Sequence, residues 1–137
     1  TPASARVLVV SPDPELRASI GQLLDAAPTN IEVTHAASGG EAQRALEASA
    51  VDLVLLDLEL PDTSAVTLSA WLRATLPHPP RILSLVSEDG HPDWQVLQAL
   101  GVSGFALKPP MPEVMLFSVR RVLADVQRAR EAERAPS

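Results

Sequence analysis

Residues 51–61 read VDLVLLDLELP, and this stretch decides the fold class of the chain. The run from Val51 to Leu56 is nearly continuously apolar, as expected for a strand buried on both faces of a parallel sheet. The run ends at Asp57, and Pro61 follows four residues later. The stretch therefore predicts a central β-strand that delivers a carboxylate to one edge of a sheet.

Two strand–helix units precede this strand. Residues 6–10 form a β-branched run that predicts a strand, and Asp13 then provides a cap for a helix that begins at Pro14. Residues 31–36 alternate as a strand does. Ser38, with a glutamate three residues later, forms a capping box that opens a helix to about residue 48.

Three further units follow. A helix is expected over residues 64–75 and a strand over residues 82–86. Pro92 is expected to open a helix that Gly101 ends, and residues 104–107 form a short fifth strand. Five strands alternating with helices imply a parallel sheet covered on both faces.

The last predicted helix opens at Pro112 and carries apolar side chains at helical spacing, at Met115, Val119, Val122 and Val126. This apolar pattern ends at Val126. We therefore assign residues 5–126 to one domain and expect residues 127–137 to be a helix end or a linker to a segment outside this sequence.

Open parallel sheets hold their sites at the carboxyl ends of the strands. This rule selects residues 11–13, 57–62 and 86–88, together with Lys108. These segments are therefore the predicted location of the functional site.

Composition limits the possible functions. The chain has 137 residues, 46% of them apolar, which suits one packed domain. Cysteine is absent, which excludes disulfides and thiol chemistry, and the net charge of −6 argues against nucleic-acid binding by this segment. No signal peptide and no apolar run of roughly 20 residues is visible, so we expect a cytoplasmic protein that does not associate with a membrane.

The ordered motifs resemble the receiver domains of bacterial response regulators across residues 5–126. That family shows a strand ending in aspartate with a proline four residues later, as at Asp57 and Pro61, and a late Lys-Pro pair, as at Lys108 and Pro109. The resemblance implies a flavodoxin-like (βα)5 fold of the α/β class, with strand order 2-1-3-4-5 and helices on both faces. It also implies a signalling domain that is not an enzyme.

The resemblance assigns roles to five residues. Asp57 would be the phosphoacceptor, which attacks a phosphohistidine and forms an acyl phosphate. Lys108 would neutralise a phosphoryl oxygen or, at rest, pair with Asp57. Phe105 matches the switch aromatic, whereas the switch hydroxyl position falls on Val86, which cannot donate a hydrogen bond. Ser87, the next residue, lies on the other face of the strand and replaces that hydroxyl only if the register shifts.

The metal site of the family is altered here. Its acidic pair falls on Ser11 and Pro12, and neither residue is a carboxylate. Asp13, Asp57 and Glu59 remain as weak candidate ligands. Mg²⁺ sites often rest on only one or two carboxylates, so losing this pair removes much of the site. We therefore expect no cofactor, with Mg²⁺ bound only if phosphorylation is retained.

These features favour an atypical receiver in a two-component phosphorelay that acts mainly through protein–protein interaction. The partner would be a histidine kinase or another signalling protein, and the resemblance assigns the face of the fourth helix, fifth strand and fifth helix to docking or homodimer formation. The alternative is a receiver that is phosphorylated on Asp57 by a histidine kinase. A nucleotide-binding or flavodoxin-like enzyme is disfavoured because residues 11–15 read SPDPE, without the glycines that cradle a phosphate.

Overall fold

The computed structural model describes residues 5–26, 30–87 and 92–134. The elements alternate along the chain as five strands and five helices. In order they are β1 (Ala5–Val10), α1 (Pro14–Asp25), β2 (Ile31–Ala36), α2 (Gly39–Ala48), β3 (Leu53–Asp57), α3 (Ala65–Thr75), β4 (Arg81–Ser87), α4 (Trp94–Ala99), β5 (Val102–Lys108) and α5 (Pro112–Arg134).

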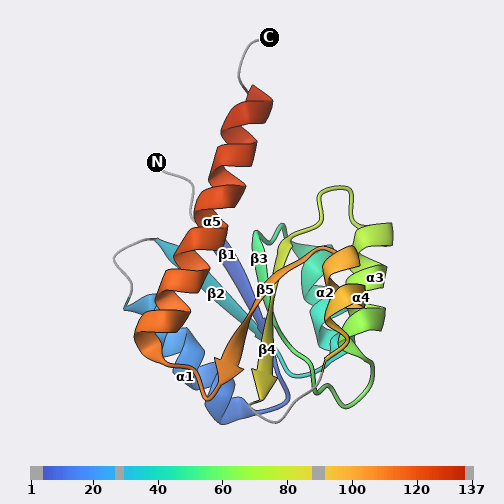
Figure 1. Ribbon diagram of the computed structural model, residues 1–137, viewed down its shortest axis with the longest axis vertical. Helices are drawn as coiled ribbons and strands as arrows, with labels where there is room; N and C mark the ends of the chain where they lie inside the picture. Colours follow the sequence, from blue (N-terminus) through green and yellow to red (C-terminus); the bar gives the residue numbers. More distant parts are fainter. Residues whose placement is uncertain (1–4, 27–29, 88–91, 135–137) are drawn as a thin grey trace.

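The five strands form one parallel sheet in the order β2-β1-β3-β4-β5, which confirms the predicted topology (Figure 1). The central apolar run predicted from the sequence forms β3, and all five residues of this strand are buried. β3 pairs with β1 on one side and β4 on the other, so the strand that ends at Asp57 lies at the centre of the sheet.

Helices cover both faces of the sheet. α1 and α5 pack on one face, while α2, α3 and α4 pack on the other (Figure 1). Strand alternation separates the two cores: Leu53 and Leu55 face α1 and α5, whereas Val54 and Leu56 face the other helices. Asp57 continues the alternation of Leu53 and Leu55, which places its side chain on the α1/α5 face.

Side-chain caps fix where the first helices begin. Asp13 accepts hydrogen bonds from the amides of Glu15 and Leu16, and Pro14 occupies the first position of α1, as predicted. Ser38 caps α2 by accepting from the amide of Glu41 at 3.2 Å. The reciprocal bond of a capping box differs slightly here, because the Glu41 carboxylate accepts from the amide of Ala37, one residue before the cap.

α4 begins later than the sequence predicted. Its first residue is Trp94 and its cap is Asp93, so Pro92 precedes the helix and does not open it. Gly101 follows the helix with φ +92°, a left-handed conformation that favours glycine and explains why α4 ends here. Ser87 belongs to β4, one residue beyond the predicted strand, and residues 88–91 lie outside the described residues.

α5 is a 23-residue helix whose carboxyl end projects beyond the rest of the domain (Figure 1). Met115, Val119 and Val122 are buried against the sheet as predicted, and Val126 is partly buried. Residues 127–134 continue the helix. No helix in the described part of the chain is long and apolar enough to cross a membrane.

Candidate functional site

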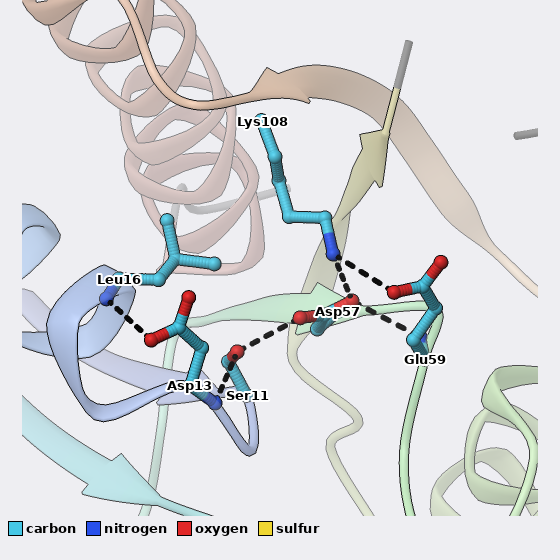
Figure 2. A network of polar contacts seen from close by, with 6 residues as sticks. All are labelled: Ser11, Asp13, Leu16, Asp57, Glu59 and Lys108. Carbon is cyan, nitrogen blue, oxygen red and sulfur yellow. Dashed lines mark hydrogen bonds and ion pairs between the residues drawn. The ribbon is translucent and has the colours of Figure 1, made fainter. Parts of the chain in front are cut away.

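Asp57 forms the centre of a polar network at the carboxyl edge of the sheet (Figure 2). Its side chain is only 2% exposed. Lys108 Nζ donates to Asp57 Oδ1 over 2.8 Å, and the amide of Glu59 donates to the same oxygen over 3.0 Å. Ser11 Oγ donates to Asp57 Oδ2 over 2.8 Å. Both carboxylate oxygens of this buried group are therefore hydrogen-bonded.

Three strands bring these side chains together. Ser11 directly follows β1 and is fully buried, Asp57 ends β3, and Lys108 ends β5. Carboxyl ends of parallel strands lie at one edge of a sheet, and all three side chains fall on its α1/α5 face. The ion pair between Asp57 and Lys108 that we expected from the sequence is present.

Charge around Lys108 favours its ammonium form. Burial lowers the pKa of Lys108, but the hydrogen bond and charge of Asp57, together with Glu59, outweigh this effect and raise the pKa above its ordinary value of 10.5. The Glu59 carboxylate lies 3.6 Å from Lys108 Nζ and is largely exposed. Lys108 therefore stands between two carboxylates and neutralises the buried one.

The β1–α1 loop is held by its own hydrogen bonds. Ser11 Oγ accepts from the amide of Asp13 over 3.2 Å while it donates to Asp57. Arg17, in the first turn and a half of α1, donates from Nη1 to the carbonyl oxygen of Ser11 over 2.5 Å. The Asp13 carboxylate caps α1, so it is directed away from Asp57 (Figure 2).

The end of β4 places the two predicted switch positions on opposite faces. The strand continues regularly through Ser87, which pairs in register with Lys108. Val86 is buried on the α3/α4 side, and alternation puts Ser87 on the same face as Leu85 and Asp57. The expectation that Ser87 needs a register shift is therefore wrong, because β4 extends regularly to Ser87 and its alternation places this residue on the Asp57 face.

Phe105 lies on the face of β5 that meets α4, and it is 54% exposed. Its ring makes an edge-to-face contact with Trp94 of α4, with centroids 5.2 Å apart and planes at 89°. This aromatic pair attaches the short helix α4, of which only Leu97 is fully buried, to the edge strand.

Asp62 joins the loop after β3 to the start of α2. Its two carboxylate oxygens accept from the amides of Gly39 and Gly40, each over 2.9 Å. These two bonds lower the pKa of the Asp62 carboxyl below its ordinary value. A side chain at Gly39 would collide with Thr63, so the glycine permits this close approach.

No group of three His, Cys, Asp or Glu side chains that could hold a metal ion occurs in the part of the chain that the structure describes. Asp52, the other buried carboxylate of this region of sequence, precedes β3 and lies at the opposite end of that strand from Asp57. It therefore does not contribute to the Asp57 site.

Sequence reasoning found Asp57 and Lys108 but missed three contacts. The hydrogen bond from Ser11 to Asp57 was signalled only by a serine at the end of a buried strand. The contact of Arg17 with the Ser11 backbone and the cap that Asp62 provides for α2 had no sequence signal, because both join segments whose relative position depends on the fold.

Comparison with known proteins decides the family. Residues 7–120 match the model of the response regulator receiver domain family. The chain belongs to this family. It is 32% identical over 121 residues to the transcriptional activator protein ExaE of Pseudomonas putida, a match that covers 86% of this chain and 55% of that protein. It is 31% identical over 116 residues to the nitrate/nitrite response regulator protein NarP of Escherichia coli, covering 84% of this chain and 53% of that protein. The chain thus spans about half the length of these two relatives.

The receiver fold is equally clear from solved structures. The signal receiver domain of a LuxO repressor-like protein from Vibrio parahaemolyticus superposes with a TM-score of 0.85 at 26% identity, covering 97% of this chain and all of that domain. Receiver domains serve two-component signal transduction, where they interact with histidine kinases and effector domains, and they are generally not enzymes. Receivers in general bind Mg²⁺ when they are phosphorylated.

Proposed function

We propose that this receiver is an atypical one that acts mainly by protein–protein interaction. The observation that carries the proposal is the hydrogen bond from Ser11 to Asp57. Ser11 stands where the family resemblance places the first of two metal-binding carboxylates, and Pro12 stands at the second. A hydroxyl that donates to Asp57 occupies the side on which the family has acidic ligands.

The residues around Asp57 do not fit a divalent cation. Mg²⁺ requires several oxygen ligands in near-octahedral geometry, usually with one or two carboxylates. Here Asp13 caps α1 and Glu59 is ion-paired with Lys108, so the other carboxylates near Asp57 are engaged elsewhere. The proposed function therefore does not involve a bound metal ion.

Asp57 also lacks the features of a ready nucleophile. Its two oxygens accept from three donors, the Ser11 hydroxyl, the Glu59 amide and the Lys108 ammonium, and a phosphoryl group would have to displace the Ser11 hydroxyl. Without a divalent metal ion, phosphoryl transfer also loses its main source of charge neutralisation. The polar network is better suited to holding the carboxyl edge of the sheet in one arrangement.

The proposed interaction surface is the α4–β5–α5 face, and its proposed occupant is a second copy of this chain. Exposed large apolar side chains gather there, namely Val96, Phe105, Leu107, Met111, Val114 and Phe117. Exposed apolar groups concentrated on one face favour a partner. Histidine kinases and other signalling proteins remain the expected partners of the pathway, and this partner class places the proposed function in the cytoplasm.

Charge on α5 favours a two-fold pairing. Phe117, which is 67% exposed, lies in an open hollow with Glu113 and Arg121, each four residues away from it. In a symmetric interface, residue i of one copy meets residue j of the other and the reverse. An antiparallel pairing of α5 centred on Phe117 therefore places Glu113 of each copy opposite Arg121 of the other.

Sedimentation velocity tests this dimer. We expect concentration-dependent dimers of the wild type, loss of dimers in Glu113→Arg and in Arg121→Glu, and recovery in the double variant. Arg44→Glu, on the exposed side of α2, is the matched control and should leave the dimer intact. A wild type that stays monomeric at high protein concentration, or a double variant no better than the single ones, would contradict the proposal.

The alternative function is a working phosphoacceptor at Asp57. Two observations favour it: Lys108 is in place, and Ser87 presents a hydroxyl on the Asp57 face of β4. This second candidate requires phosphoryl transfer to Asp57 to proceed without the two metal-binding carboxylates that Ser11 and Pro12 replace.

Intact-mass spectrometry after incubation with a small phosphodonor and Mg²⁺ separates the two functions. The atypical receiver predicts no phosphoryl adduct in the wild type. It predicts an adduct in the variant Ser11→Asp with Pro12→Asp, and loss of that adduct when Asp57→Asn is added. A wild-type adduct that disappears in Asp57→Asn would favour the phosphoacceptor instead. We also propose that residues 5–126 form the receiver unit of this chain.

A further inference from the structure

We propose that the ion pair between Arg130 and Asp52 holds the last two turns of α5 against the amino end of the central strand β3. We call this ion pair the latch. Arg130 Nη2 donates to Asp52 Oδ1 across a separation of 78 residues in sequence. The contact lies at the end of the sheet opposite the Asp57 network and does not depend on the proposed function of that site.

Asp52 joins several elements at this end. Its Oδ2 accepts from the amide of Arg6 over 2.8 Å, and its own amide donates to the carbonyl of Arg6 over 2.9 Å. Its carbonyl oxygen accepts from the amide of Arg81 over 3.0 Å. With Arg130 as the fourth contact, Asp52 connects the start of β1, the start of β4 and the end of α5.

The carboxylate is buried and needs a cation. Asp52 is 6% exposed, while the Arg130 side chain is 46% exposed. Without Arg130, Asp52 would keep one backbone donor for a charge that is almost entirely removed from water, which is costly. The pair therefore differs from the exposed pairs of the surface, which contribute little.

The end of α5 has no other attachment among the described residues. Residues 127–133 are all exposed, and a short helical segment without tertiary packing is marginal in water. Arg130 continues the body-facing series of Val119, Val122 and Val126 at helical spacing, so a charged contact replaces the apolar one on the same face. Arg128 forms only a local pair with Asp125, one turn earlier.

The latch attaches α5 to β3, the same strand that ends at Asp57. Asp52 immediately precedes this strand and Asp57 is its last residue, about 17 Å away at ~3.3 Å per residue. The direction of the last turns of α5 is thus set by the central strand of the sheet.

Hydrogen exchange of the amides of residues 127–133 tests the latch. In Arg130→Met, which keeps the apolar stem and removes the charge, we expect exchange in this segment to become about tenfold faster. The control Arg128→Met should change these rates by less than about twofold. High salt should accelerate exchange in the wild type and not in Arg130→Met.

Exchange in β3 reports whether the variant remains folded, because these amides open only with the global structure. Unchanged exchange in residues 127–133 of Arg130→Met would overturn the proposal. Equal acceleration in Arg128→Met would also overturn it, since the local pair would then account for the protection. Slow exchange that is retained in β3 of Arg130→Met would show that faster exchange in residues 127–133 is local, so both outcomes are decisive.

Discussion

Replacing Lys108 by methionine tests the electrostatics of the Asp57 network. Lys108→Met keeps a flexible apolar stem but leaves the carboxylate of Asp57, only 2% exposed, without a cation. Removing one member of a buried ion pair costs about 3–5 kcal/mol. Asp57 keeps the hydrogen bonds from Ser11 and from the amide of Glu59, so we expect the lower end, about 3 kcal/mol of unfolding free energy.

The pH dependence has a definite sign. The pKa of Lys108 is raised in the folded state, so its contribution to stability is fully present below 10.5 and is lost as the pH rises through the folded pKa. The difference in stability between wild type and Lys108→Met should therefore be constant near neutral pH and shrink above 10.5. Urea denaturation at several pH values measures it, provided that the m-value is unchanged.

Two further variants complete the test. Asp57→Asn with Lys108→Met removes both charges and should recover most of the lost stability. Arg6→Met, which breaks the exposed pair with Glu32, should cost less than about 1 kcal/mol. A Lys108→Met protein as stable as Arg6→Met, or a double variant no more stable than Lys108→Met, would refute the reasoning.

Three other substitutions have expected outcomes. Ser84 is fully buried and its hydroxyl has no hydrogen-bond partner among the described residues, so Ser84→Ala should raise the unfolding free energy by about 1 kcal/mol in urea denaturation. Gly101→Ala should lower the melting temperature, because its φ of +92° is strained for alanine and a Cβ would lie 2.5 Å from Arg73 Nη1. Because the pKa of Asp62 is lowered in the folded state, its contribution to stability is present above pH 3.8 and is lost as the pH falls below that value. Wild type and Asp62→Asn should therefore become equally stable in acid. A difference in stability that persists unchanged at low pH would exclude the Asp62 cap as its cause.

The sequence predicted the fold because its signals are local. A buried apolar run, alternating strands and capping residues each depend on a few neighbouring positions, and all five strands and their order agree with the structure. The predicted start of α4 was wrong by two residues because the sequence allows the helix to begin at Pro92 or after Asp93. In the structure the Asp93 carboxylate accepts from the amide of Val96 and caps the helix at the later position.

The site was predictable only in part. Asp57 and Lys108 could be predicted as site residues because each ends a predicted strand. The contact of Ser11 with Asp57 depends on the register in which β1 and β3 pair, which the sequence does not show. The register of β4 decides that Ser87, and not Val86, shares the face of Asp57. The role of Arg130 could not be predicted, since nothing in the sequence near it shows that the helix ends over a buried carboxylate.

Magnesium binding tests the central claim most directly, that this receiver has lost its metal site while keeping Asp57 and Lys108. An NMR titration with Mg²⁺ would follow the backbone amides of Ser11, Asp57, Glu59 and Lys108. We predict no saturable shift of these amides in the wild type, and a saturable shift in the variant Ser11→Asp with Pro12→Asp. Saturable binding of Mg²⁺ to the wild type at these amides, abolished by Asp57→Asn, would contradict the claim.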